Sequence, residues 1–216
     1  MPATTMKLSR SLLSAGLLVA ALGTVGRAQI ERLDLEQIVT RSDNAVFATI
    51  VDKTVFRVDH PVDGPELYYT RLTLKGSSLM DGRDATTDVI FAGGFIDKER
   101  GIGSFNSEAP SEDDVRIGNR VVVFYKWTDN IGGDVSGNAI YAAHGGVYRT
   151  AKGPQGVVVL GRGEGFALEG NRKLAELDTA VTAIRTAWEL EQAKLKQQQP
   201  TTSGATTSGQ KPSGQE

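Results

Sequence analysis

The chain offers few of the side chains that usually carry catalysis. It has no cysteine and two histidines, His60 and His144. His144 lies in the run Ala-His-Gly-Gly, where glycines open the backbone around the ring. A nucleophilic site would need a serine beside this ring and an acid to orient it, yet neither a G-x-S-x-G turn nor an H-E-x-x-H motif is present. We therefore expect a structural histidine near a hairpin turn, with a hydrolase using His144 and a carboxylate as the enzymatic alternative.

Two segments contain residue types that bind ions. Glu112-Asp113-Asp114 clusters three carboxylates, but it lacks the alternating spacing of a calcium loop, so we expect a solvated loop and regard calcium as the only metal worth testing. In Gly161–Gly165 the glycines alternate with other residues, whereas a dinucleotide loop needs a different spacing at the start of a helix. A turn between strands is expected there. The sequence predicts no cofactor.

A group of polar and aromatic side chains forms the candidate ligand-binding surface. Tyr69, Arg71 and Thr73 alternate with apolar residues, which places them on the solvent face of a half-buried strand. Trp127 and His144 complete the group, as a ring for stacking and a group for hydrogen bonding. Core packing is the competing interpretation for the aromatic residues, because they lie in or beside predicted strands.

The first 28 residues predict export. Basic residues precede an apolar run over residues 11–25, and Gly26 and Ala28 are small residues at the positions that a signal peptidase reads. The run is shorter than the roughly 20 residues needed to cross a bilayer. We expect a cleaved signal peptide over residues 1–28, with an uncleaved anchor as the alternative. The mature chain would then begin at Gln29, have no membrane span, and be secreted or periplasmic.

The net charge of the chain limits the classes of molecule that it is expected to bind. The net charge is −2 for the whole chain and −5 once the three basic residues of the signal are removed. This mild acidity argues against a nucleic-acid partner, because binding phosphates needs a clustered basic face. The absence of cysteine means that the fold must depend on a hydrophobic core. The expected partner is a protein or a glycan, and the expected state is a monomer or a weak homodimer.

Hydrophobic patterns predict one β-domain over residues 29–170. It begins with one or two helical turns near residues 33–39 and continues as strands separated by Gly, Asp, Asn and Pro clusters. The strands are expected at residues 45–58, 67–75, 87–91, 120–127, 139–143, 146–149 and 157–160. With loops of hairpin to medium length and no helices between them, they predict an antiparallel barrel or sandwich.

Two strands have informative patterns. The run Val121–Tyr125 is apolar on both faces, which predicts a central strand or one covered by a helix. The strand at residues 45–58 is long enough to bend and to be shared between two sheets, which would close a small barrel.

The C-terminal region divides into a helix and a tail. Residues 171–199 predict an amphipathic helix with Asn171 as its N-cap and an apolar stripe that covers the β-domain. A self-associating coiled coil is the alternative use of this stripe, which consists of Leu174, Leu177, Val181, Ile184 and Trp188. Residues 200–216 contain Thr, Ser, Gly, Gln and Pro and too little apolar surface to fold, so a disordered tail is expected.

Several of these motifs occur together in a familiar order. The order is a helical turn, a strand, a Tyr-Thr strand ending Lys75-Gly76, the pair Gly93-Gly94, and a Gly-x-Arg followed by a Val-rich strand at Gly118–Phe124. It resembles a loosely defined group of exported bacterial β-domains, some of which lie beside secreted proteases. The resemblance covers about residues 33–166. It implies a partly open barrel like the oligonucleotide/oligosaccharide-binding (OB) barrel, and it implies no activity.

These observations together predict a mainly β protein with a small antiparallel OB-like barrel, an N-terminal helical turn and a C-terminal amphipathic helix. The expected function is a secreted, non-enzymatic binding module of the cell envelope or exterior. An assembly protein that self-associates through its C-terminal helix is the first alternative, and a hydrolase using His144 is the second.

Overall fold

The computed structural model describes residues 33–198. The predicted signal peptide and the predicted tail therefore lie outside the described residues. Within the described range, no helix is long and apolar enough to cross a membrane. In chain order the elements are α2 (Leu35–Arg41), β1 (Asn44–His60), β2 (Gly64–Ser78), β3 (Asp84–Ala92), β4 (Gly94–Asp97), β5 (Ile102–Ser104), β6 (Arg120–Thr128), β7 (Gly137–Ile140), the 3-10 helix η2 (Ala143–Gly146), β8 (Val147–Gly153), β9 (Gly156–Val159), β10 (Arg172–Lys173) and α3 (Leu174–Gln198).

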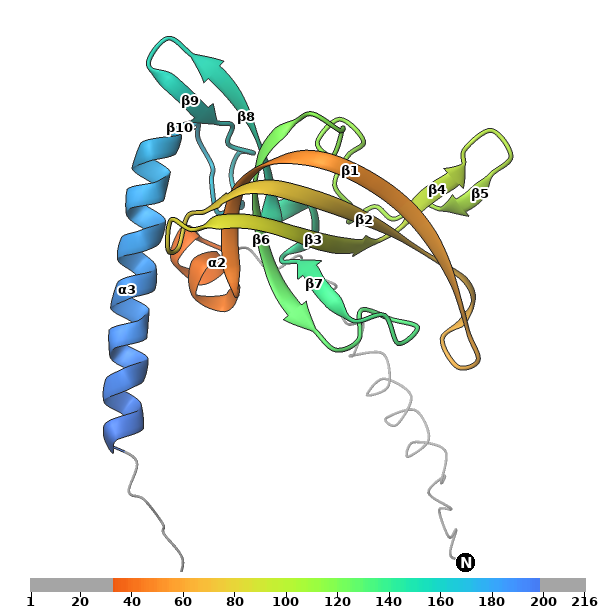
Figure 1. Cartoon of the computed structure of the whole chain (residues 1–216), viewed down its shortest axis with the longest axis horizontal. Coiled ribbons are helices and arrows are strands. Elements are labelled where there is room, and N and C mark those ends of the chain that lie inside the picture. Colours follow the sequence, from red (N-terminus) through yellow and green to blue (C-terminus); the bar gives the residue numbers. More distant parts are fainter. Residues whose placement is uncertain (1–32, 199–216) are drawn as a thin grey trace, which may run out of the picture. The chain divides into compact units, whose positions relative to one another are not determined.

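Five strands close into a barrel (Figure 1). The ring runs β1-β2-β3-β7-β6 and returns to β1. Every pairing in the ring is antiparallel except the one between β3 and β7, which is parallel and joins Ile90 to Ala139. A five-stranded barrel of this kind is the OB architecture, so the predicted fold class is confirmed. The ring is closed rather than partly open, and the pairing of β3 with β7, which consists of this one residue pair, is its shortest.

Strand β1 makes closure possible because it serves two neighbours. It pairs with β2 along nearly its whole length and with β6 only over Asn44–Thr49. A bulge between Ile50 and Asp52 interrupts the β1–β2 register at the point where β1 leaves β6. A bulge increases local twist and bends the strand. The long, shared first strand predicted from the sequence is therefore confirmed.

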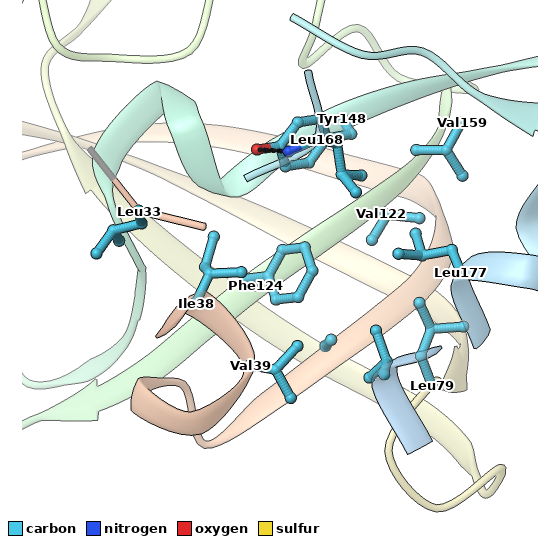
Figure 2. Close-up of a cluster of buried hydrophobic side chains, with 12 residues drawn as sticks. Leu33, Ile38, Val39, Leu79, Val122, Phe124, Tyr148, Val159, Leu168 and Leu177 are labelled. Atoms are coloured by element: carbon cyan, nitrogen blue, oxygen red, sulfur yellow. Dashed lines mark hydrogen bonds between the residues drawn. The ribbon is translucent and has the colours of Figure 1, made fainter. Parts of the chain in front are cut away.

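Strand β6 separates two hydrophobic cores. Val121, Val123 and Tyr125 point into the barrel, where they pack with the inner residues of β1, β2 and β3. Val122 and Phe124 point outward into a second core formed with the two helices (Figure 2). All five side chains are buried. The apolar character of both faces of β6 thus follows from its place in the barrel wall beneath helices.

The two helices supply the other side of this outer core. α2 begins with a capping box in which Asp34 accepts a hydrogen bond from the Gln37 amide and the Gln37 side chain accepts one from the Asp34 amide. It buries Ile38 and Val39. α3 buries Leu177 and Val181 in the same cluster, and its Thr182 hydroxyl donates to the carbonyl of Leu79.

The start of α3 corrects one expectation. Asn171 does not cap the helix, which begins at Leu174 after the short strand β10. Its side-chain oxygen instead accepts a hydrogen bond from the Gly161 amide at 3.0 Å and so fastens the preceding loop. Toward the C-terminal end of α3, Leu190 and Leu195 are exposed.

Removing a buried side chain from α3 tests this packing. We expect Leu177→Ala to lower the free energy of unfolding by about 3 kcal/mol, because a fully buried leucine leaves a cavity. The same change at exposed Leu195 of the same helix should cost less than about 0.5 kcal/mol. Urea denaturation followed by circular dichroism measures both. Equal small losses would show that α3 does not pack on the barrel.

Candidate functional site

The candidate site is a cleft of about 870 Å³ at one end of the barrel. Its floor continues the inner faces of three strands. Val55 of β1 and Phe91 of β3 both pair with Thr70 of β2, and alternation along the strands places all three on the same side as buried Leu72 and Val89. The mouth of a small barrel is a common place for ligand sites. We call this cavity the barrel-mouth cleft.

The walls of the cleft come from segments that cross the barrel end. They are β4, β5, the loop over residues 105–115, η2, β8 and the loop after β9. The lining residues are Lys53, Val55, Thr70, Phe91, Gly94, Phe95, Lys98, Ser104, Phe105, Asn106, Ser107, Ala109, Pro110, Ser111, Glu112, Asp114, Val115, His144, Arg149 and Arg162. Figure 1 shows the β4–β5 hairpin on the far side of the barrel from α3. α3 therefore leaves this end of the barrel uncovered.

Gly94 allows the wall to fold tightly against the floor. Its φ is +129°, and a Cβ at this position would lie 2.4 Å from the Thr70 hydroxyl oxygen. Thr70 in turn donates a hydrogen bond of 2.7 Å to the Gly93 carbonyl. Both the positive φ and the close approach require glycine. The chain can therefore turn sharply from β3 into β4 at the edge of the cleft.

A buried carboxylate fastens the opposite wall. Asp114 has a side chain only 10% exposed, and it pairs with Arg162 at 2.7 Å and with Arg149 at 3.1 Å. Burial is the largest single effect on its carboxyl group and alone would raise the pKa. Hydrogen bonds with Ser111 and Arg162 and the charges of both guanidinium groups outweigh burial, so the pKa of Asp114 lies below its usual value. Asp114 is therefore a structural anion between two cations.

The two arginines differ in how firmly they are held. Arg162 also donates from Nε to the Val147 carbonyl at 2.8 Å, and it lies about 6 Å from the rings of Tyr148 and Phe166. Its side chain is 21% exposed, whereas that of Arg149 is 50% exposed. Arg162 is thus fixed in the wall, and Arg149 is open to the cleft.

The cleft has an excess of positive charge. Four basic side chains line it, from Lys53, Lys98, Arg149 and Arg162, against the two carboxylates of Glu112 and Asp114. The whole chain has the opposite sign, with a net charge of −2. The local field at the cleft therefore favours an anionic group.

Of the predicted ligand-binding residues, His144 lies in this cleft. Its amide donates to the Glu108 carbonyl at 2.9 Å, its ring Nδ1 lies 3.3 Å from the same oxygen, and the ring packs edge-on against Phe166. Because a carbonyl can only accept, Nδ1 is assigned as the protonated nitrogen. The ring is held by main chain beside a tight turn, in which Ala142 and Ala143 have positive φ.

Tyr69, Arg71 and Thr73 lie on the other face of β2, turned away from the cleft floor. Arg71 is exposed and its guanidinium lies 5.1 Å from the Phe56 ring centre, while Thr73 donates to Asp88. Tyr69 is only 4% exposed, which differs from the solvent face predicted for it. Its ring stacks on Phe56 and its hydroxyl lies beside Gly132 in the β6–β7 loop.

Trp127 lies near the end of β6, away from the residues that line the cleft. It is 54% exposed, and its indole Nε1 donates to Asp129 at 3.0 Å. The five predicted residues therefore do not form one site. His144 belongs to the cleft, Tyr69, Arg71 and Thr73 to the opposite face of β2, and Trp127 to the end of β6.

The acidic run is not a uniform solvated loop. Glu112 pairs with Lys98 and Asp113 with Arg116, while Asp114 is buried between two arginines. In the described part of the chain, no three acidic or histidine side chains converge into a group that could hold a metal ion. The expectation of a solvated loop was wrong for Asp114, because its side chain turns toward cations from segments distant in sequence.

In comparison with known proteins, no protein-family model and no curated protein sequence matches the chain.

Sequence reasoning missed Asp114, Arg149 and Arg162 as partners in one site. Arg149 is the last residue of the strand predicted at residues 146–149, and Arg162 lies in the glycine-rich turn predicted at Gly161–Gly165. The sequence does show charged residues beside glycine-rich segments, but this pattern does not identify which charged side chains form ion pairs with one another. Their meeting depends on the register of β8 with β6 and on the return of the loop after β9.

The buried ion pair gives a pH-dependent prediction. Because the pKa of Asp114 is lowered by folding, its ionised form stabilises the fold above the unfolded pKa, and this contribution is lost as the pH falls through the folded pKa. We expect Asp114→Asn to lower the free energy of unfolding by about 2 kcal/mol at neutral pH. The difference from the unmodified protein should shrink toward zero in acid. Chemical denaturation across a pH series measures it.

Asp113→Asn is the matched control, since that carboxylate is 70% exposed and pairs with an exposed arginine. Its effect should stay within about 0.5 kcal/mol at every pH. A loss for Asp114→Asn that persists unchanged in acid would contradict the role of its charge.

Proposed function

We propose that this protein is a secreted, non-enzymatic binding module of the cell envelope or exterior, and that its ligand enters the barrel-mouth cleft. One observation carries the proposal. The cleft joins an apolar floor to an excess of positive charge, in a volume of about 870 Å³. Small-ligand and peptide-anchor sites have this composition, with mostly apolar walls and a few polar groups that set orientation.

Of the two expected partner classes, the lining favours a protein over a glycan. Phe91, Phe95, Phe105 and Val55 contribute aromatic and branched apolar surface. A glycan presents many hydroxyl groups, and each one buried against such a wall without a hydrogen bond has an unfavourable free energy. An apolar or aromatic side chain from a protein segment gains free energy at the same place.

The position of His144 supports binding over catalysis. In a Ser-His-Asp arrangement, a carboxylate orients one ring nitrogen and the reacting group lies at the other. Here the Nδ1 partner is a main-chain carbonyl, which orients the ring but adds no negative charge beside it. A hydrolase using His144 would therefore lack the carboxylate that the sequence-based alternative requires at this nitrogen.

Self-association through α3 is the second candidate. Leu190 is 59% exposed and Leu195 is 49% exposed, on the part of the helix beyond its buried residues. These two leucines could meet a second copy. A monomer or weak homodimer fits this small surface better than a stable assembly, because few apolar residues are available to bury.

A site-specific photo-crosslinker locates the binding surface. We would place it at Phe105, which is 82% exposed on the cleft rim, and separately at Arg71 on the opposite face of β2. Each mature protein is then incubated with native envelope and culture-medium fractions. A discrete adduct from position 105 alone is the expected result. An adduct from position 71 alone would move the site to the outer face, and none from either position would count against a binding module.

A further inference from the structure

The cations of the cleft are not equally available to a ligand. Arg162 is committed to Asp114 and to the Val147 carbonyl, and Lys98 pairs with Glu112 at 3.0 Å. Arg149 uses Nε toward Asp114 and keeps half of its side chain exposed. Within residues 33–198, Lys53 forms no ion pair, and the ion pair of Arg149 is with a carboxylate that Arg162 also binds. These two groups therefore carry the positive charge that the wall does not neutralise.

Asp114 also fixes where the Arg149 group points. An exposed arginine loses rotamer freedom when it binds an anion, which reduces affinity. Here the contact between Nε and the Asp114 carboxylate already holds the guanidinium at the cleft wall. Its terminal N–H groups form a planar fork, the geometry that matches a carboxylate. A ligand carboxylate would meet a donor that is already positioned.

Apolar surface lies in the same cavity as this donor. Phe105 is 82% exposed at the rim, and Phe91, Phe95 and Val55 are half-buried in the floor and wall. Aromatic residues and arginine are both enriched in the cores of protein interfaces. The two features together define what a ligand must present, which is a negative charge next to an apolar side chain.

We propose that the barrel-mouth cleft binds a peptide segment in which a carboxylate lies beside an aromatic or branched apolar side chain, with Arg149 as the principal donor to that carboxylate. This inference rests on the proposed function and specifies its partner. A nucleic acid fits poorly, because Glu112 and Asp114 line the same cavity and phosphates need a denser set of cations. An acidic peptide needs one available guanidinium group and an apolar wall, and the cleft has both.

The test uses three blocked tripeptides of the form acetyl-Phe-X-Phe-amide, where X is Asp, Asn or Lys. Calorimetric titration of the mature protein gives the affinity of each. We expect the Asp peptide to bind about tenfold more tightly than its Asn isostere, since a hydrogen-bonded charge contributes about 1.4 kcal/mol or more. The Lys peptide should bind most weakly. The preference for Asp should weaken with added salt, because screening reduces it.

Variants of the protein assign the effect to the cleft. Arg149→Gln should remove the preference for Asp over Asn and leave the Asn peptide's affinity unchanged, while Arg149→Lys should restore part of it. Asp114 keeps Arg162 as a partner in these variants, so the fold is retained. Arg172→Gln is the matched control, because that arginine is exposed on β10 outside the cleft. It should change none of the affinities.

The outcomes separate this inference from the proposed function. Equal binding of the Asp and Asn peptides in the cleft would overturn the acidic requirement and leave a binding module in place. Failure of all three peptides, or Arg149-dependent binding of oligogalacturonate in their place, would overturn a peptide occupant. The crosslinking result at position 105 would then decide by itself whether the cleft binds anything.

Discussion

The buried ion pair at Asp114 holds the cleft end of the barrel together. A barrel of five strands is open at both ends, so other segments of the chain must cover its hydrophobic core there. Val115 packs into the barrel interior with Leu72 and Val89, and the neighbouring Asp114 binds arginines from β8 and from the loop after β9. One carboxylate therefore joins three segments that are distant in sequence. The same contact that seals the barrel also presents Arg149 to solvent.

The rest of the architecture follows from the position of β6 between two hydrophobic cores. Its inner residues belong to the barrel core and its outer residues to the core beneath α2 and α3, where Tyr148 packs edge-on against Phe124 (Figure 2). With the helices on this side of the barrel, the opposite end is left for β4, β5 and the loop over residues 105–115. The outer core beneath the helices and the proposed binding cleft thus lie in different parts of one domain.

Patterns of period two and of helical spacing were sufficient to predict the fold class. The doubly apolar Val121–Tyr125 run, the long first strand and the stripe on α3 each correspond to an observed packing arrangement. The capping role of Asn171 was wrong, because its side chain bonds to Gly161 across a loop. Tyr69 was placed in solvent because alternation along a strand does not reveal that another loop lies over it.

The candidate site was much less predictable. Of its charged groups, Glu112 and Asp114 were noticed only as a possible calcium loop, and Arg149 and Arg162 were not linked to them. Ion pairs across distant segments depend on register and on loop paths, which leave no periodic signal in the chain. His144 was recognised because it is one of two histidines, and its interpretation as a structural residue near a turn agrees with its main-chain hydrogen bonds.

The most direct test of the account is to map an acidic peptide onto the protein by amide chemical shifts in solution. The account predicts shifts that cluster at Phe91–Phe95, at residues 104–115 and at Arg149, with little change along the outer residues of β2. Shifts concentrated instead at Arg71 and Thr73, or near Leu195 at the end of α3, would contradict the assignment of the barrel-mouth cleft as the binding site.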